Sequence, residues 1–242
     1  MQIVFCENTE DISLAATNII LGQLLTKKNS LLCLATGQSP TGTYHMLTRE
    51  YTADPGLFDQ LRIIKLDEWG NVAMDHPMMC ESYLQKHVIG PLHIDSDRYL
   101  SFNSMAQNPD AECDRMQHLL EEQGSIDLCV LGLGRNGHLA LNEPARSLKA
   151  GCHVAKLATS TLQHDMIAGM EQKPTYGFTL GMVDIMKSKK IILLISGSQK
   201  AKITRALFNR RISTNLPASM LWLHPNVICL ADRQACLPQY GK

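Results

Sequence analysis

The sequence predicts an α/β fold: a single-domain, doubly wound and mostly parallel sheet with helices on both faces. Two observations support this prediction. Short, continuous apolar runs recur along the chain, which is typical of strands that are buried on both faces. The segments between these runs are long enough to hold helices, and such alternation favours parallel strands. We expect one domain over residues 1–242, because no linker, repeat or low-complexity segment interrupts the pattern.

The first part of the chain supplies three of the predicted strands. Met1–Cys6 is expected to be a strand, followed by a helix over Asp11–Leu25, whose apolar residues recur at helical spacing. Leu31–Ala35 and Leu61–Leu66 are the next apolar runs and are predicted to be strands. The segments predicted to form helices after these two strands are Thr41–Tyr51 and Pro77–Val88.

The second part repeats the alternation. Ile126–Leu131, Ile191–Ile195 and Val227–Ala231 are apolar runs of strand length. Asp110–Gln123 and Gln199–Phe208 lie between strands and are predicted to be helices. The order of elements therefore indicates crossover connections throughout.

Composition excludes several classes of function. Lys+Arg and Asp+Glu are both 23, so the net charge is zero and no basic face for nucleic acid is indicated. No apolar stretch has the length of a membrane span, and no charged region precedes the first apolar run as in a signal peptide. We therefore expect a cytoplasmic protein without a membrane or nucleic-acid partner.

Cysteine and histidine spacing gives no indication of a metal site. The eight cysteines form no CxxC pair, and several lie within apolar runs, so we expect free thiols in a reducing compartment. The nine histidines include no HExxH pattern. Neither a zinc site nor a disulfide framework is predicted.

The glycine-rich segment after Ile126–Leu131 contains a dinucleotide fingerprint, Gly132-x-Gly134-x-x-Gly137. Such a fingerprint requires a helix after the turn and an acidic residue about 20 positions on. Here Pro144 follows soon after the turn, and no Asp or Glu lies between Pro144 and His164. Nicotinamide binding is therefore not predicted.

The same segment presents two candidates for proton transfer. His138 lies in the turn, and Glu143 follows five residues later. Ligands bind at the carboxyl ends of strands in α/β sheets, so both residues are expected at a binding crevice. Glu143 is expected to bond the imidazole of His138, which would raise its pKa; a capping or pairing role within the loop is the alternative.

The turn after Leu31–Ala35 resembles an anion site. Gly37 and Gly42 have the spacing of a nucleotide-triphosphate loop, but the Lys-Ser/Thr pair that should follow is absent. Ser39 is expected to be the N-cap of a helix whose first residue is Pro40. Backbone N–H groups, hydroxyls and a helix N-terminus would suit a phosphate, and a plain capped turn is the alternative.

Charged residues follow two further strands. Asp67 and Glu68 come directly after Leu61–Leu66, and in a continuing strand their side chains point in opposite directions, so one of them is expected to face a pocket. A solvated loop is the alternative. Lys200 follows Ile191–Ile195 and is expected to donate to a bound anion, with an exposed surface lysine as the alternative.

Five segments, taken in order, resemble motifs of the glucosamine-6-phosphate deaminase/isomerase family. These are ATGQSPTGTY, KLDEW, LGLGRNGHLALNEP, TLGMVDIM and GSQKA, within a similarity that runs from Leu31 to Asp232. The related 6-phosphogluconolactonases share the Rossmann-like fold but carry DER and a GxxPDGHTASLFP run where this chain has DEW and NEP. CLATG, KLDEW, IDLCVLGLG and PASMLWLH are most similar to the galactosamine-6-phosphate branch.

The resemblance implies a role for each matching residue. Asp67 matches the base that moves a proton from C2 to C1 of the open-chain sugar, and His138 matches the residue that opens the pyranose ring. Glu143 matches the partner of that histidine. Asn136 occupies the position of an orienting group that is Asp in some members, and Asn keeps the hydrogen bond while removing a charge.

The resemblance also implies how the substrate is held, with no metal or organic cofactor. The residues that match phosphate ligands by position are Gly37, Gln38, Ser39 and Lys200. The further residues expected at the substrate are Thr41, Glu68 and Gly134. The family's phosphate arginine aligns near Ile167, but no arginine lies within Ser160–Ile167. The phosphate is therefore expected to be held with one fewer guanidinium, or with His164 or another basic residue as a substitute.

The expected activity is conversion of galactosamine 6-phosphate to tagatose 6-phosphate and ammonia. The alternatives are deamination of glucosamine 6-phosphate to fructose 6-phosphate, a 6-phosphogluconolactonase, and a sugar-phosphate-sensing module of a transcriptional regulator. The last would need a DNA-binding domain, for which the chain has no spare length or basic segment. No allosteric C-terminal extension is expected, and both a monomer and a homo-oligomer are compatible with the sequence.

Overall fold

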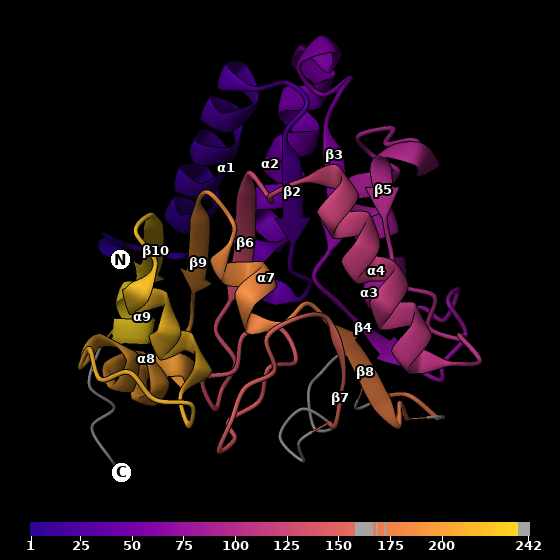
Figure 1. The fold of residues 1–242 in the computed structure, drawn as a ribbon. Coiled ribbons are helices and arrows are strands. Elements are labelled where there is room, and N and C mark those ends of the chain that lie inside the picture. The colour runs from indigo at the N-terminus through magenta and orange to yellow at the C-terminus, as the bar shows by residue number, and fades with distance from the viewer. Residues whose placement is uncertain (158–166, 168, 172, 237–242) are drawn as a thin grey trace.

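The chain folds around a seven-stranded sheet in which every neighbouring pair of strands is parallel (Figure 1). The computed structural model describes residues 1–157, 167, 169–171 and 173–236. The strand order is β1-β10-β9-β6-β2-β3-β5. The strands are β1 Gln2–Cys6, β2 Leu31–Leu34, β3 Arg62–Lys65, β5 Tyr99–Leu100, β6 Leu128–Gly132, β9 Ile191–Ile195 and β10 Val227–Asp232.

Helices cover both faces of this sheet, as predicted. The helices are α1 Thr9–Thr26, α2 Gln38–Ala53, α3 Cys80–Leu84, α4 Pro109–Gln123, α7 Met182–Met186, α8 Ala201–Phe208 and α9 Arg233–Cys236. Apolar residues of α1 and α2 pack with one set of strand side chains, and those of α4, α7, α8 and α9 pack with the other set. The 3-10 segments are Pro55–Leu57, Ser96–Arg98, Ser198–Lys200 and Pro217–Leu223, and a π-helical turn, Gln85–Ile89, continues α3.

The strand order reverses between β2 and β6. After β2 the chain adds β3 and β5 on one side, and it then returns to place β6 on the other side of β2. The turns that leave β2 and β6 therefore run in opposite directions, and such a reversal opens a crevice at the carboxyl edge of a parallel sheet.

A second, three-stranded antiparallel sheet lies beside the carboxyl edge of β3 and was not predicted. Its order is β4-β8-β7, with β4 Asp67–Gly70, β7 His153–Ala155 and β8 Tyr176–Thr179. β4 begins only two residues after β3 ends, so Asp67 and Glu68 lie on a strand. Of the two alternatives given for this pair, a continuing strand and a solvated loop, the strand is confirmed. The predicted helix over Pro77–Val88 is also shorter, because α3 begins only at Cys80.

The start of α2 differs from the prediction. The N-cap is Gly37, with φ of 96°, and the helix begins at Gln38 rather than at Pro40. The expected N-cap role of Ser39 is therefore wrong. Glycine adopts this left-handed conformation without the steric cost of a Cβ atom, so the chain enters the helix two residues earlier than the Ser-Pro signal indicated. Ser39 consequently lies in the first helical turn.

Three properties of the described residues bear on the functional class. All eight cysteines are free and six are buried, as expected for thiols that serve as small apolar residues. Within the described ranges, no helix is long and apolar enough to cross a membrane. The same residues include no group of three or more His, Cys, Asp or Glu side chains placed to hold a metal ion.

A buried carboxylate ties together the amino-terminal edge of the sheet. Asp127, 1% exposed, accepts hydrogen bonds from the amide of Leu31 at 2.9 Å, from Lys27 at 2.7 Å and from Lys189 at 2.8 Å. Burial alone would raise the pKa of Asp127, but these three donors hold it below its usual range. The ionised carboxylate therefore stabilises the junction of β2, β6 and β9.

Asp127→Asn is expected to lower the free energy of unfolding by about 1–3 kcal/mol near neutral pH, because the lysines lose their anionic partner. A depressed carboxyl pKa contributes stability that is present above the unfolded pKa of about 3.9 and is lost as the pH falls through the folded value. Urea unfolding near pH 7 and near pH 3.5 measures both effects, and the difference between parent and variant should shrink at the lower pH. Asp95→Asn, which removes an exposed ion pair with Arg98, is the control and should change stability by less than about 0.5 kcal/mol. An equal loss for Asp127→Asn at both pH values would contradict the electrostatic explanation.

Candidate active site

A cavity of about 510 Å³ opens at the reversal of strand order. Five segments line it: the turn after β2, the start of β4, the helical segment 77–87, the loop after β6 and the turn after β9. Parallel strands deliver their carboxyl ends to one edge of the sheet, so segments that lie far apart in the sequence meet there. Chain direction and strand order together create this site.

The structure brings most of the predicted site residues to this cavity. The predicted residues that line it are Gly37, Gln38, Ser39, Thr41, Asp67, Gly134, His138 and Lys200. Asn136 and Glu143 are not lining residues but contact His138. Glu68 is the one predicted site residue that the structure does not bring to the cavity or to its histidine.

His138 is held by a short chain of hydrogen bonds. Its Nδ1 lies 3.2 Å from Oε2 of Glu143, and the side-chain amide of Asn136 donates to the same oxygen at 2.7 Å. The backbone amide of His138 donates to Oδ1 of Asn136 at 3.1 Å. Glu143 thus engages the ring through Nδ1, which leaves Nε2 for proton exchange with a ligand.

Glycine at position 134 allows the imidazole to lie directly against the backbone. A Cβ atom at Gly134 would be 2.3 Å from Cδ2 of His138, so any other residue would displace the ring. Gly137 has φ of 88° and donates from its amide to the Gly134 carbonyl at 3.0 Å, which closes the turn. No helix occurs in residues 133–152, so the segment lacks the helix that a dinucleotide fingerprint requires. The glycines instead allow the turn to close and leave room for the imidazole of His138.

Asp67 opens β4 and contributes a carboxylate to the cavity. Burial, followed by the negative charge of Glu68, raises the pKa of Asp67 to about 7, and the positive charge of Lys65 opposes this rise. A carboxyl group with such a pKa is present in both protonation states near neutral pH. It is therefore suited to accept a proton and to return it.

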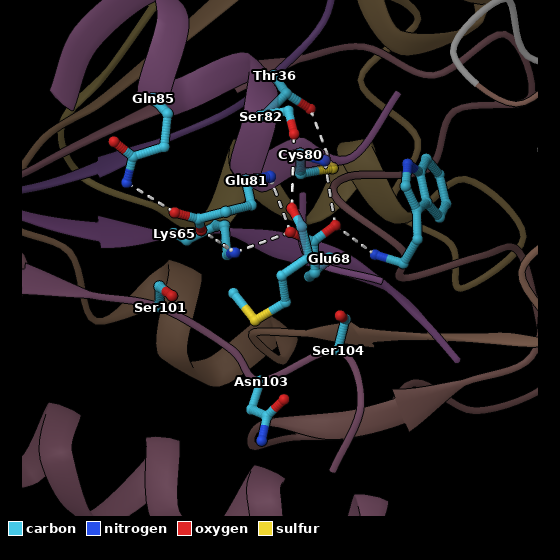
Figure 2. Close-up of polar contacts among 12 residues, drawn as sticks. Thr36, Lys65, Glu68, Cys80, Glu81, Ser82, Gln85, Ser101, Asn103 and Ser104 are labelled. Carbon is cyan, nitrogen blue, oxygen red and sulfur yellow. Dashed lines mark hydrogen bonds and ion pairs between the residues drawn. The ribbon is translucent and has the colours of Figure 1, made fainter. Parts of the chain in front are cut away.

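Glu68 follows Asp67 on β4 and is 1% exposed. Figure 2 shows its polar contacts. Its Oε2 is 2.8 Å from Nζ of Lys65, and its two carboxylate oxygens accept backbone N–H bonds from Trp69, Cys80 and Glu81. Successive side chains of a strand point in opposite directions, so with Asp67 at the cavity Glu68 must face inward. We therefore correct the expectation that Glu68 contacts the substrate and assign it to the support of β4.

The start of α2 and the turn after β9 form one end of the cavity. Gln38 and Ser39 lie in the first turn of this 16-residue helix, and Oγ of Ser39 is 3.4 Å from Oγ of Ser196. Thr41 donates to the Gly37 carbonyl at 2.9 Å, which stiffens the turn. Helix N-termini attract anions through unpaired N–H groups and the helix dipole.

Two cations face the same end of the cavity. Lys200 and Arg135 both line it, and Lys200 donates to the carbonyl oxygen of Leu133. Burial, reinforced by the positive charge of Arg135, lowers the pKa of Lys200 to about 8. An anion bound between the helix start and these side chains would relieve the repulsion between the two cations.

Sequence reasoning missed several residues that line the cavity. They are Trp69, Tyr83, Lys86, His87, Arg135 and Ser196. Arg135 had a recognisable signal, because it is the charged residue within the glycine turn. Tyr83, Lys86 and His87 had none, because they come from a helical segment that follows no strand of the main sheet. Only the tertiary structure brings that segment to the crevice.

The phosphate arginine of the family was expected near Ile167, in a segment of which only Ile167 belongs to the described residues. Ile167 is fully buried in an apolar cluster with Trp69, Met79 and Leu141. His164, named above as a substitute, lies outside the described residues. Among the described residues, Lys86, Arg135 and Lys200 are the lysine and arginine side chains that line the cavity.

Comparison with known proteins identifies relatives over nearly the whole chain. A family model described as glucosamine-6-phosphate isomerases/6-phosphogluconolactonase matches residues 10–229. The chain is 41% identical over 226 residues to the AgaI protein of Escherichia coli (strain K12), covering 93% of this chain and 90% of that protein. It is 37% identical over 237 residues to a glucosamine-6-phosphate deaminase of Geobacillus sp. (strain WCH70), covering 97% and 94% of the two chains.

Solved structures show the same architecture. A monomeric glucosamine-6-phosphate deaminase superposes with a TM-score of 0.91 at 34% identity, covering 97% of this chain and 98% of the other. A 6-phosphogluconolactonase from Leishmania guyanensis superposes with a TM-score of 0.80 at 20% identity, covering 99% of each chain. The second similarity shows the shared fold alone.

Asp67→Asn is expected to stabilise the protein above neutral pH, because it removes a buried charge without changing the shape of the side chain. A raised folded pKa means that the unfolded carboxyl ionises first, so the parent loses stability between about pH 4 and pH 7. Urea unfolding should show parent and variant alike near pH 4 and the variant more stable by about 1–3 kcal/mol near pH 8. Asp59→Asn, at an exposed carboxylate, is the control and should show no such trend. An Asp67→Asn variant that is less stable than the parent near pH 8 would refute the raised pKa.

Proposed function

The chain belongs to the family of glucosamine-6-phosphate isomerases and 6-phosphogluconolactonases, and from this membership we propose that it deaminates and isomerises an amino sugar 6-phosphate, with galactosamine 6-phosphate as the substrate. The observation that carries the proposal is the pairing, in one cavity, of a carboxyl group that titrates near neutrality, Asp67, with a Glu-supported histidine, His138. Hydrolysis of a lactone needs no base at C2. The position and pKa of Asp67 therefore favour the deaminase over the lactonase.

The phosphate of the substrate binds at the end of the cavity formed by α2 and the turn after β9. Backbone N–H groups at Gln38 and Ser39, together with the positive charges of Lys200 and Arg135, compensate its negative charge. Because phosphate is attached at C6, this contact places C1 and C2 at the opposite end of the sugar. Gly37, Ser39 and Thr41 shape the turn that receives the phosphate.

His138 opens the pyranose ring by moving a proton between the anomeric hydroxyl and the ring oxygen. Glu143 supports this step through its contact with Nδ1, which orients the imidazole and leaves Nε2 for the substrate. Asn136 donates to the same carboxylate and orients it without adding a second negative charge. Gly134 allows the ring to remain against the backbone of the loop.

Asp67 then transfers a proton within the open-chain substrate. Its carboxylate removes the proton from C2 of the amino aldehyde to give an enolamine, and it returns a proton to C1 to give an iminium at C2. Water adds at C2, the C–N bond breaks, and ammonia leaves to give tagatose 6-phosphate. The sum is one water consumed and one ammonia released.

Glucosamine 6-phosphate is the second candidate substrate. The relatives from Geobacillus and the monomeric solved structure are both named as glucosamine-6-phosphate deaminases, which favours this sugar. The two epimers differ only at the C4 hydroxyl, and the same proton transfers would convert glucosamine 6-phosphate to fructose 6-phosphate. The motifs KLDEW and PASMLWLH favour galactosamine.

The decisive experiment measures ammonia release from galactosamine 6-phosphate and glucosamine 6-phosphate side by side. We expect release from both, with the larger kcat/KM for the galactosamine epimer. If neither sugar releases ammonia, the proposed reaction is excluded. A larger kcat/KM for the glucosamine epimer would retain the reaction and make glucosamine 6-phosphate the preferred substrate. Hydrolysis of 6-phosphogluconolactone by the same preparation tests the lactonase alternative.

Asp67→Asn is the matched control for this assay. Removal of a general base lowers turnover by about 10²–10⁴-fold, and exchange of the C2 proton with solvent deuterium should be lost to the same extent. Far-ultraviolet circular dichroism verifies that the variant is folded. Exchange at the parental rate would remove Asp67 from the role of base.

Phosphate binding is expected to weaken as the pH rises above about 8. The pKa of Lys200 is lowered to about 8, so its ammonium loses its positive charge above that pH. The basic limb of kcat/KM reports this ionisation in the free protein. Lys200→Arg keeps the positive charge at all accessible pH values and should move the limb upward by at least about one pH unit. Lys202→Arg, at the neighbouring exposed lysine, is the control. A basic limb that is unchanged in Lys200→Arg would exclude Lys200 as its origin.

A further inference from the structure

Two residues close to Asp67 in the sequence, Lys65 and Glu68, form a buried cluster of charged side chains with Glu81 (Figure 2). Nζ of Lys65, which is fully buried, is 2.8 Å from Glu68 and 2.6 Å from Glu81. Glu81 also accepts hydrogen bonds from Gln85 at 2.8 Å and from the hydroxyl of Tyr99 at 3.0 Å. The proposed mechanism uses none of these groups, although they lie at the junction that presents the base.

Resting on the function proposed above, we propose that Lys65 and Glu68 are positioning residues for Asp67, which hold its strand in place and set, with opposite signs, the pH at which its carboxyl ionises. Lys65 precedes Asp67 by two residues at the end of β3, and Glu68 follows it on β4. Neither side chain lines the cavity. Both therefore act on the base through the protein rather than through the substrate.

The positional part of the proposal rests on the contacts of Glu68. Its carboxylate accepts N–H bonds from Trp69 at 2.7 Å, from Cys80 at 3.1 Å and from Glu81 at 2.8 Å. These bonds join β4 to the first turn of α3. Because Glu68 is fixed on the inner side of the strand, alternation fixes Asp67 on the cavity side.

The electrostatic part rests on the net charge of the cluster. One ammonium and two carboxylates leave one negative charge in the cluster. Burial and the charge of Glu68 raise the pKa of Asp67, and Lys65 lowers it. Removal of the Lys65 charge would leave two negative charges, and removal of the Glu68 charge would leave none, so the two changes should move the ionisation of Asp67 in opposite directions.

Other titratable groups near Asp67 contribute little charge. The thiols of Cys33 and Cys80 and the phenol of Tyr44 are buried, and burial raises the pKa of each well above its ordinary value, so all three are neutral near pH 7. His138 lines the same cavity and would favour the ionised carboxyl when protonated. Among the described residues, the cluster is thus the source of fixed charge on the sheet side of Asp67.

Stability alone does not account for a buried lysine in this place. Replacing buried ion pairs by apolar side chains of similar volume is often neutral or stabilising, because the desolvation of the charges offsets their attraction. The hydrogen bonds within the cluster limit this cost, and Glu68 has a structural role of its own because it accepts three backbone N–H bonds, whereas the ammonium of Lys65 contacts only the two carboxylates among the described residues. What an apolar junction cannot supply is a defined charge next to the carboxyl.

The test compares Glu68→Gln with Lys65→Met in two measurements: the acidic limb of kcat/KM for ammonia release, and the titration of the Asp67 carboxyl by ¹³C NMR without substrate, assigned by its absence in Asp67→Asn. We expect Glu68→Gln to shift both to lower pH by about one unit and Lys65→Met to shift both upward by about one unit. Shifts in the same direction, or no shift in either variant, would overturn the proposal. A purely structural role would lower the plateau rate and leave the limb in place.

Two further variants complete the design. Asp127→Asn disrupts another buried carboxylate with two lysine partners, at the opposite edge of the sheet, and should leave both titrations unchanged. The double variant Lys65→Met/Glu68→Gln keeps one negative charge on Glu81 and should titrate near the parent. If Lys65→Met alone does not fold, the upward shift is read by comparing the double variant with Glu68→Gln, and no difference between these two overturns the proposal.

The two measurements separate this inference from the proposed function. Ammonia release tests the deaminase, whereas the carboxyl titration needs no substrate and tests the cluster alone. A protein that releases no ammonia but shows opposite shifts would refute the function and retain the electrostatic role of the cluster. A protein that releases ammonia but shows no shift in the titration would retain the proposed function and refute the electrostatic role of the cluster.

Discussion

The reversal of strand order between β2 and β6 is the constraint on which the rest of the structure depends. A parallel sheet places all its carboxyl ends at one edge, but helices that continue in one direction would cover that edge uniformly. Here β3 and β5 are added on one side of β2, and β6, β9 and β10 follow on the other. The turns on the two sides diverge, and the crevice between them collects the start of α2, the loop that carries His138 and the start of β4 with Asp67.

Each side of the crevice solves a different local problem. On the β6 side, the ring of His138 must lie close to the backbone, and Gly134 leaves room for it. On the β3 side, a charged residue must be presented at the point where one sheet ends and another begins. There the buried carboxylate of Glu68 satisfies three backbone N–H groups and turns Asp67 toward the cavity. The conformation of the His138 loop thus depends on a glycine, which has no side chain, and the orientation of β4 depends on the buried side chain of Glu68.

Six strands of the main sheet were predicted because they are continuous apolar runs such as Leu31–Leu34 and Ile191–Ile195, a signal carried within each segment. The seventh strand, β5, was not predicted, because its two residues, Tyr99–Leu100, are too few to form such a run. The small sheet was not predicted either, because β4 carries two carboxylates and its antiparallel partner β8 lies more than 100 residues away. The cavity-lining residues that were predicted come from turns at strand ends, which share one edge of the sheet. Side chains alternate between the two faces of β4, so Asp67 and Glu68 face opposite sides. The strand pattern alone did not determine which of the two faces the cavity.

The pairing of β6 with β2 has a consequence for how the site comes into being. Asp67 and the start of α2 belong to the first 70 residues, whereas His138 and Lys200 come after β6. β1, at the start of the chain, pairs only with β10, near the end of the described residues. Such non-local pairings close long loops and form slowly. A chain emerging from the ribosome therefore carries Asp67 long before it carries His138, and the cavity that brings the two together forms only when the late strands have paired.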